Sequence, residues 1–157
     1  MATPIQQFVN IRTTQGGADA FVQTEEYTGI SPADGLVWLI KRIEVSFTTA
    51  CGLQGISADA EISFALSRET AVAVVEKNDS ACLYKGGFVN SLTTSGQIEV
   101  PREFVYVPED GLVIVGPSLF AQLDSTATGL TLVADWRIFY NSVKISELEI
   151  LRMLSQG

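Results

Sequence analysis

The feature that most constrains the fold is a long alternation of apolar and polar side chains from Leu130 to Asn141. Every second residue is apolar, and this set is Leu130, Leu132, Ala134, Trp136, Ile138 and Tyr140. The intervening positions are mostly polar, with Val133 and Phe139 as exceptions. A period of two is that of a β-strand with one face in a core and the other in solvent. The segment therefore predicts a long strand with Trp136 at the centre of its core face.

The segment Leu36–Thr48 shows the same alternation with a change of phase. Its large apolar residues fall first on even and then on odd positions, namely Leu36, Trp38, Ile40, Ile43, Val45 and Phe47. The phase changes at Lys41-Arg42. One extra residue in a strand would keep both halves facing the same core, so this pair predicts a β-bulge or sharp bend. The alternative is a strand whose beginning is buried on both faces.

Further strands follow from weaker patterns. Ala60–Leu66 alternates clearly, and the remaining candidates are Gln6–Arg12, Ala20–Thr28, Cys82–Val89, Gln97–Val100, Glu103–Val107 and Leu112–Phe120. Turn residues separate them at short intervals, as at Asn78-Asp79, Gly86-Gly87 and Gly116-Pro117. The stretch Ser67–Ser80 favours an irregular connection, with a helical turn or two as the alternative. Because parallel sheets need helical crossovers, the pattern predicts an all-β antiparallel sandwich or closed barrel. The 157 residues match one domain.

Two turns have nearly the same sequence. Pro32–Val37 and Pro108–Val113 differ at one residue, and each precedes an apolar strand. Proline presets the turn and glycine permits a positive φ at its exit. Either the two turns are equivalent positions in two Greek-key halves of one sandwich, or the same turn chemistry recurs without structural equivalence.

The end of the chain changes character. Ser146 and Glu149 have the spacing of a helical capping box, which predicts a short helix over residues 145–155. Its large apolar residues, on more than one face, are Leu148, Ile150, Leu151, Met153 and Leu154. A helix that packs against one surface needs only a single apolar stripe. Because these five residues cover more than one face, we expect them to form a subunit interface. The alternative is a helix packed across an open end of the sandwich.

The chain contains no histidine, which removes the commonest general base and metal ligand. Neither Gly16-Gly17 nor Gly86-Gly87 has the sequence of a phosphate loop, and both are interpreted as turns. Glu25 with Glu26, and Asp59 with Glu61, offer oxygen ligands for calcium, but neither pair matches an EF-hand and solvated carboxylates are the default. We therefore predict no catalytic residue, cofactor or metal, and no enzyme activity unless two carboxylates converge in a deep cleft.

The charge pattern limits the partners. The chain carries 10 Lys and Arg against 18 Asp and Glu, a net charge of -8, and Lys41-Arg42 is its only basic pair. Nucleic-acid binding needs clustered cations, so we expect no direct binding. No secretory signal or transmembrane segment is evident, so we expect synthesis in a cytoplasm. Cys51 and Cys82 are expected to be reduced structural thiols, with a disulfide or partner contact as the alternative.

In this organisation, residues 5 to 142 resemble the single jelly-roll proteins that build or decorate icosahedral virus shells. The resemblance implies eight strands in two facing sheets, homo-oligomers, location in the virion, and partners that are copies of itself and other shell proteins. The chain departs from the coat proteins of small RNA viruses because it lacks a basic arm. The alternative is a carbohydrate-binding or adhesion module, which requires Trp38, Trp136 or Tyr140 in an open groove; the strand phase instead favours packing in the core.

Overall fold

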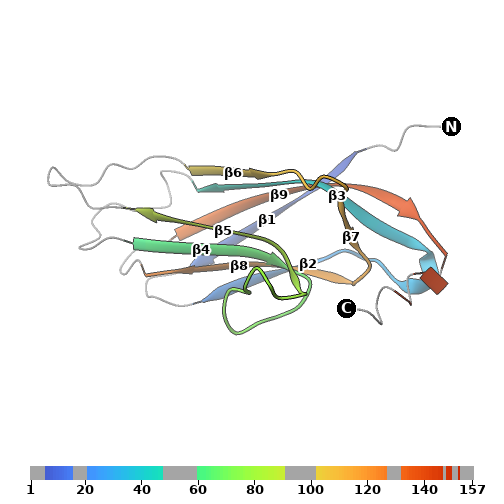
Figure 1. The fold of residues 1–157 in the computed structure, drawn as a ribbon, viewed down its shortest axis with the longest axis horizontal. Helices are drawn as coiled ribbons and strands as arrows, with labels where there is room; N and C mark the ends of the chain where they lie inside the picture. Colours follow the sequence, from blue (N-terminus) through green and yellow to red (C-terminus); the bar gives the residue numbers. More distant parts are fainter. Residues whose placement is uncertain are drawn as a thin grey trace, which may run out of the picture.

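The structure is a computed structural model that describes residues 6–15, 21–47, 60–90, 102–126, 132–146, 148, 149 and 152. These residues form nine strands in two antiparallel sheets packed face to face (Figure 1). The strands are β1 (Gln7–Gln15), β2 (Val22–Tyr27), β3 (Leu36–Phe47), β4 (Ala60–Ser67), β5 (Cys82–Asn90), β6 (Arg102–Tyr106), β7 (Leu112–Ile114), β8 (Ser118–Ser125) and β9 (Leu132–Lys144). The predicted all-β antiparallel sandwich is confirmed.

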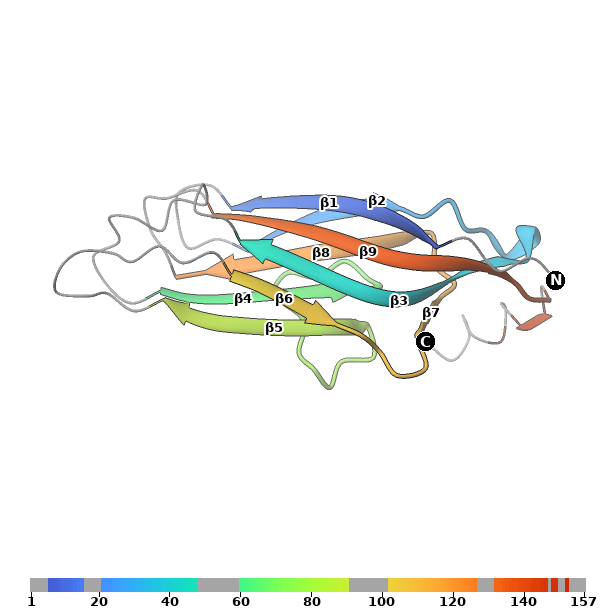
Figure 2. The ribbon, with the colours of Figure 1, turned by 90° about the horizontal axis from the view of Figure 1, so that it is seen from above.

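The order of strands in each sheet is far from their order in sequence. The five-stranded sheet runs β1-β9-β3-β6, with β7 also paired to β3, and the four-stranded sheet runs β2-β8-β4-β5. In Figure 2, β1, β9, β3 and β6 follow one another across one layer. The pairs β1–β9, β2–β8, β3–β6 and β4–β5 are nested one inside the next along the chain. The chain therefore pairs like one long antiparallel ribbon whose successive sections alternate between the two sheets.

The core lies between the sheets and contains the apolar positions of the predicted alternations. On β9, Leu132, Ala134, Trp136 and Ile138 are buried, and Trp136 retains only 1% of its exposed surface. The largest fully buried side chains are Trp136, Phe64, Ile40, Ile43, Ile62, Leu66, Ile114, Leu119, Leu123, Leu132 and Ile138. The prediction that Trp136 belongs to the core is confirmed.

The predicted bulge is present in β3. Ile40 pairs with Tyr140 on β9 and Arg42 pairs with Phe139, so Lys41 is the extra residue. Ile40 and Ile43 are both fully buried despite their opposite phases. The alternative also holds in part, because neighbouring residues at the start of β3 are buried as well.

The single strand expected over Leu112–Phe120 is wrong. β7 ends at Ile114 and β8 begins at Ser118, and the two strands belong to different sheets. The chain between them includes Gly116-Pro117, and proline cannot donate a hydrogen bond to a strand ladder. The mostly apolar segment Leu112–Phe120 therefore supplies two strands, one in each sheet, and their buried residues face the core from opposite sides.

The interpretation of Gly86-Gly87 as a turn is also wrong. Both residues lie inside β5, where Gly86 pairs with Phe64 of β4. A Cβ atom on Gly86 would lie 2.7 Å from Cε2 of Phe64. Glycine is present here because the Phe64 ring occupies the space of a side chain, a close approach that strand glycines often mark.

The two related turns share the predicted glycine conformation. Gly35 has φ of 65° and Gly111 has φ of 78°. Both turns contain a backbone hydrogen bond between residues three apart, because Gly111 N donates to Pro108 O and Asp34 N donates to Ser31 O in the 3-10 helix η1 (Pro32–Asp34). Moreover, β7 pairs directly with β3.

Other predictions fall wholly or partly outside the described residues. Gln97–Val100, Gly16-Gly17, Cys51 and Asp59 lie there. At the end of the chain, Glu149 N donates to Ser146 Oγ over 3.3 Å, which is one of the two bonds of the predicted cap. Leu148, Glu149 and Arg152 have helical backbone, and the other residues after Ser146 are outside. In the part of the chain described, no helix has the length and apolar character needed to cross a membrane.

Candidate assembly surfaces

The aromatic residues that would have formed a sugar-binding platform are in the core. Trp136 and Trp38 are 1% and 8% exposed. Tyr140 is half-buried and stacks on Trp38, with ring centroids 3.7 Å apart. Burial raises the pKa of the Tyr140 hydroxyl, and nearby Glu26 raises it further. The two tryptophans therefore offer no open face to a ligand.

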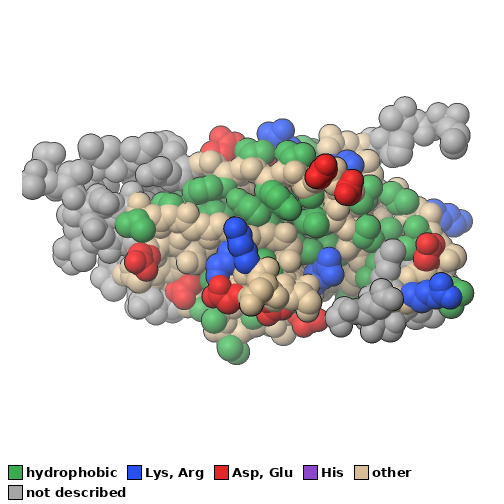
Figure 3. Space-filling view, viewed as in Figure 1, with side chains coloured by type: hydrophobic (Ala, Val, Ile, Leu, Met, Phe, Trp, Pro, Cys, Tyr) green, Lys and Arg blue, Asp and Glu red, His purple; other side chains and the backbone are tan. Residues whose placement is uncertain are grey.

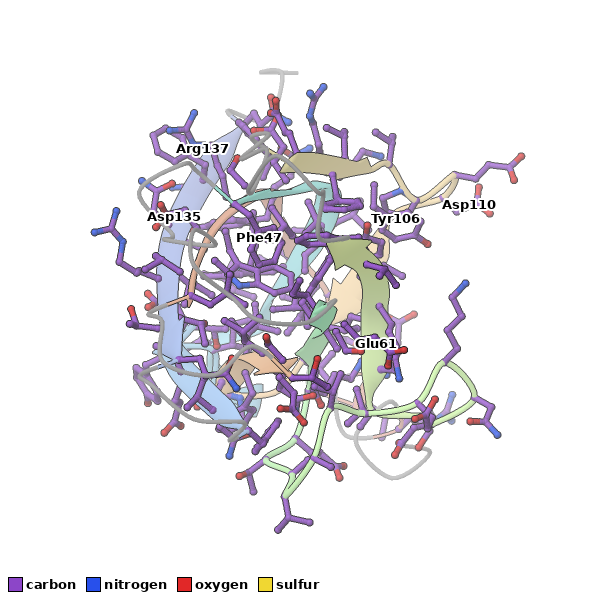
Figure 4. All side chains as sticks on the ribbon, turned by 90° about the vertical axis from the view of Figure 1, so that its left-hand side faces the viewer. Phe47, Glu61, Tyr106, Asp110, Asp135 and Arg137 are labelled. Carbon is purple, nitrogen blue, oxygen red and sulfur yellow. The ribbon has the colours of Figure 1, made fainter. Side chains whose placement is uncertain are left out.

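The outer face of the five-stranded sheet carries charged and polar side chains in rows. Paired residues of neighbouring strands point to the same side of a sheet, so the strand register defines these rows. From β1 through β9 and β3 to β6, they are Asn10, Arg137, Glu44 and Val105, and then Arg12, Asp135, Ser46 and Glu103. A third row is Phe8, Phe139 and Arg42. We call these eleven residues the charged face; Figure 4 shows Asp135 and Arg137 on the outer side of the sheet and Phe47 in the core.

Side chains on the charged face interact mainly along and between the rows. Arg12 Nε and Asp135 Oδ1 are 2.7 Å apart, as are Arg42 Nε and Glu44 Oε1. Arg137 Nε donates to Asn10 Oδ1 over 3.2 Å. All of these groups except Arg42 line a depression of about 490 Å³. The charged face thus has a defined arrangement of charged groups around a depression.

Arg137 also covers an aromatic ring. Its guanidinium carbon lies 5.4 Å from the centroid of Phe8, within cation–π range. Phe8 itself is 56% exposed and contacts Phe139. Apolar surface therefore remains open to solvent beside the charges.

The outer face of the four-stranded sheet is partly covered by the connection between β4 and β5, an irregular segment as the sequence favoured. Gln122 of β8 is fully buried, and its Oε1 accepts a hydrogen bond from Val75 N over 3.0 Å. Gln23 of β2 bonds to Thr70 and to the backbone N–H of Ala71. The chain's own loop thus occupies part of this face.

An aromatic strip lines the edge between β5 and β6, which belong to different sheets. Tyr84 stacks on Tyr106 at 4.9 Å between centroids, and Phe88 stacks on Phe104 at 5.5 Å. All four rings are only partly buried. Figure 3 looks onto this edge and shows hydrophobic side chains gathered along its middle. Burial raises the pKa of the Tyr84 hydroxyl, with a smaller contribution from Tyr106.

Of the five residues predicted to form a subunit interface, the structure describes one. Leu148 is 61% exposed. The side chains of Ile150, Leu151, Met153 and Leu154 lie outside the described residues. An exposed leucine is compatible with an interface and does not by itself define one.

Of the four carboxylates considered for calcium, the structure describes Glu25, Glu26 and Glu61. Glu25 is exposed and accepts a hydrogen bond from Ser118 Oγ over 2.6 Å. Glu61 is exposed as well. Within the described ranges, no group of three or more Asp, Glu or Cys side chains is placed to hold a metal.

Cys82 is a free thiol, as the reduced interpretation expected for it. Burial raises its pKa, and Asp79 and Glu76 add to this effect while Lys85 opposes it. Since the thiolate is the nucleophile, a raised pKa lowers reactivity at neutral pH.

Sequence reasoning missed the charged face. The alternation places Asp135 and Arg137 on the polar side of their strand, but their neighbours on β1, β3 and β6 are far away in sequence. The sequence signal for the charged face is the set of polar residues that alternate with the apolar ones along each strand. Only the register decides which polar residues share a row.

Comparisons with known proteins give structural neighbours alone. No family model and no curated protein sequence matches the chain. Solved structures similar to it include structures of viruses and a BFDV capsid protein. A structure of Desmodium yellow mottle tymovirus has 6% identity and a TM-score of 0.45, covering 92% of this chain and 91% of that chain. A decameric BFDV capsid protein has 7% identity and a TM-score of 0.38, covering 90% and 99%. PorU from Porphyromonas gingivalis has 7% identity and a TM-score of 0.41, covering 87% of this chain and 13% of PorU.

Proposed function

We propose that this chain is a virion structural protein, a self-assembling capsid or capsid-decorating subunit with a jelly-roll fold. It has no catalytic role in this proposal. Its partners are copies of itself and other shell proteins, and it binds no nucleic acid directly.

The observation that carries the proposal is the strand order. Four nested pairs, β1–β9, β2–β8, β3–β6 and β4–β5, wind one antiparallel ribbon into two sheets of four principal strands. This is the arrangement of a double-sheet jelly roll, and β7 is a short addition on β3. Jelly rolls recur in viral capsids, lectins and cupins.

Two observations disfavour the other jelly-roll functions. A metal-binding cupin site depends on histidine, and the chain has none. A lectin-type platform needs exposed aromatic rings, whereas Trp38 and Trp136 are buried. The carbohydrate-binding alternative therefore loses both tryptophans on which it depended, and its third residue, Tyr140, is half-buried and stacked on Trp38.

The proposal includes the C-terminal segment as a subunit interface. Leu148 is exposed in the structure, and Ile150, Leu151, Met153 and Leu154 follow it in a pattern broader than one stripe. Burying apolar surface contributes about 25 cal/mol per Å², although ordering costs offset part of this in association. We expect this segment to contribute more to assembly than to the fold of the isolated subunit.

Light scattering after size-exclusion chromatography, with electron microscopy of the same fractions, tests self-assembly. The full-length protein is expected to form homo-oligomers of defined size. A chain that remains monomeric at millimolar concentration would overturn self-assembly as its function.

Deletion of residues 146–157 tests the C-terminal interface. The truncated chain should unfold cooperatively and should assemble less than full-length protein. The double substitution Leu148→Asp with Leu151→Asp should have the same effect, and Glu149→Gln in the same segment is the matched control. If the truncated chain does not fold while full-length protein is a stable monomer, the segment belongs to the core.

A further inference from the structure

We propose that the charged face is a self-complementary surface that binds the same face of a second copy. The two copies are related by a two-fold axis that lies between β9 and β3 and runs parallel to both strands. The inference rests on the proposed self-assembly and names the surface responsible for one contact. Isologous contacts of this kind are the commonest in homo-oligomers.

The strand register decides which residues meet. A two-fold rotation about this axis places β9 over β3 of the second copy and β1 over β6, without shifting the rows along the strands. Arg137 then faces Glu44, and Arg12 faces Glu103. Each contact occurs twice, so four cations and four carboxylates are opposed.

The remaining opposed pairs, each with at least one uncharged member, are compatible with the same axis. Asp135 faces Ser46, whose hydroxyl can donate to its carboxylate. In the third row, Phe139 faces Arg42, which is the composition of a cation–π pair. Asn10 faces Val105, an edge residue that is 49% exposed.

The perpendicular two-fold axis gives the opposite result. If the axis ran across the strands through the row of Arg137, this residue would meet its own copy, and Glu44 would meet Glu44. Like charges in direct opposition disfavour association. The order of charges therefore selects one orientation of the second copy.

Both residues at the centre of the contact have capacity for a partner. Arg137 is exposed, and among the described side chains its contacts are with Asn10 and Phe8 rather than with a carboxylate. Glu44 is held in place by Arg42, which orients its carboxylate. Exposed Glu103 has no ion pair within the described ranges either.

The depression supplies room for the opposing side chains. Its volume of about 490 Å³ is lined by the two charged rows and is open to solvent. On the opposite face of the sandwich, Gln122 and Gln23 bind the connection between β4 and β5, which covers part of that face. Sheets packed face to face also keep their strands roughly aligned, as this axis requires.

Charge reversal and exchange test the inference. Arg137→Glu and Glu44→Arg should each weaken self-association on the order of 100-fold, because each reverses two contacts worth roughly a factor of ten. Mixing the two variants should restore a one-to-one complex, since every opposed pair again joins opposite charges. The double variant should also self-associate. Analytical ultracentrifugation measures the association of the two single variants, their mixture and the double variant. Circular dichroism and thermal melts establish that each variant is folded.

Matched controls lie on the other sheet and its loop. Glu61→Arg and Lys77→Glu reverse exposed charges away from the charged face and should leave association unchanged. If wild-type protein assembles and Arg137→Glu assembles equally well, this inference is wrong while the proposed function stands. The same holds if both single variants dissociate but neither the mixture nor the double variant recovers. Wild-type protein that never self-associates overturns both.

Discussion

Replacing Gly86 by alanine tests the packing that the structure assigns to this residue. The new Cβ would contact the Phe64 ring, 2.7 Å from Cε2. Phe64 is fully buried and its ring contacts Phe47, Phe104 and Trp136, so it has little room to move. Forcing an extra carbon into a packed core costs about 1–3 kcal/mol. Alanine also reduces the conformational entropy of the unfolded chain relative to glycine, which offsets roughly 0.4–1 kcal/mol of this cost.

We therefore expect Gly86→Ala to lower the free energy of unfolding by about 1–2 kcal/mol. For a chain of this size, that corresponds to a fall in melting temperature of roughly 2–8 °C. Urea denaturation followed by tryptophan fluorescence measures the difference, at protein concentrations where the subunit is dissociated. Gly116→Ala is the matched control, because nothing lies within 4 Å of its added Cβ and its φ is not positive.

A double-mutant cycle identifies the cause. In a Phe64→Leu background the clash is removed, so Gly86→Ala should cost less or should stabilise the protein. Equal stability of Gly86→Ala and wild type would refute the reasoning. So would an unchanged cost in the Phe64→Leu background, because the loss would then have another origin.

Three further predictions follow from burial, ionisation and ligand chemistry. Trp136→Ala should lower the free energy of unfolding by about 3–5 kcal/mol in chemical denaturation, and a loss below about 1 kcal/mol would contradict its core position. Since burial raises the pKa of Tyr84 above its ordinary value of 10.0, the folded state holds this proton more tightly than the unfolded state. Stability should therefore fall as pH rises through this range, and Tyr84→Phe should reduce the fall in a urea titration at pH 8 and 10.5. EDTA should leave the melting temperature unchanged, and a decrease of several degrees would reveal a carboxylate site near Asp59 and Glu61.

The sequence by itself determined the strands whose two faces differ in environment. Alternation specified β9 and β4, and placed Trp136 in the core, because period two is a property of the backbone and needs no partner strand. It also located the bulge at Lys41, since a phase change along one segment is visible without tertiary information.

Tertiary structure alone decided the pairing, and with it both corrections and the charged face. Gly116-Pro117 marks a break within Leu112–Phe120, but only the pairing shows that β7 and β8 belong to different sheets. Gly86 is chemically identical to a turn glycine, and what distinguishes it is the Phe64 ring on a strand about twenty residues earlier in the chain. Arg137 and Glu44 become neighbours through a register between distant strands. Local sequence encodes the period of a strand, whereas strand order and register depend on contacts between residues far apart in the chain.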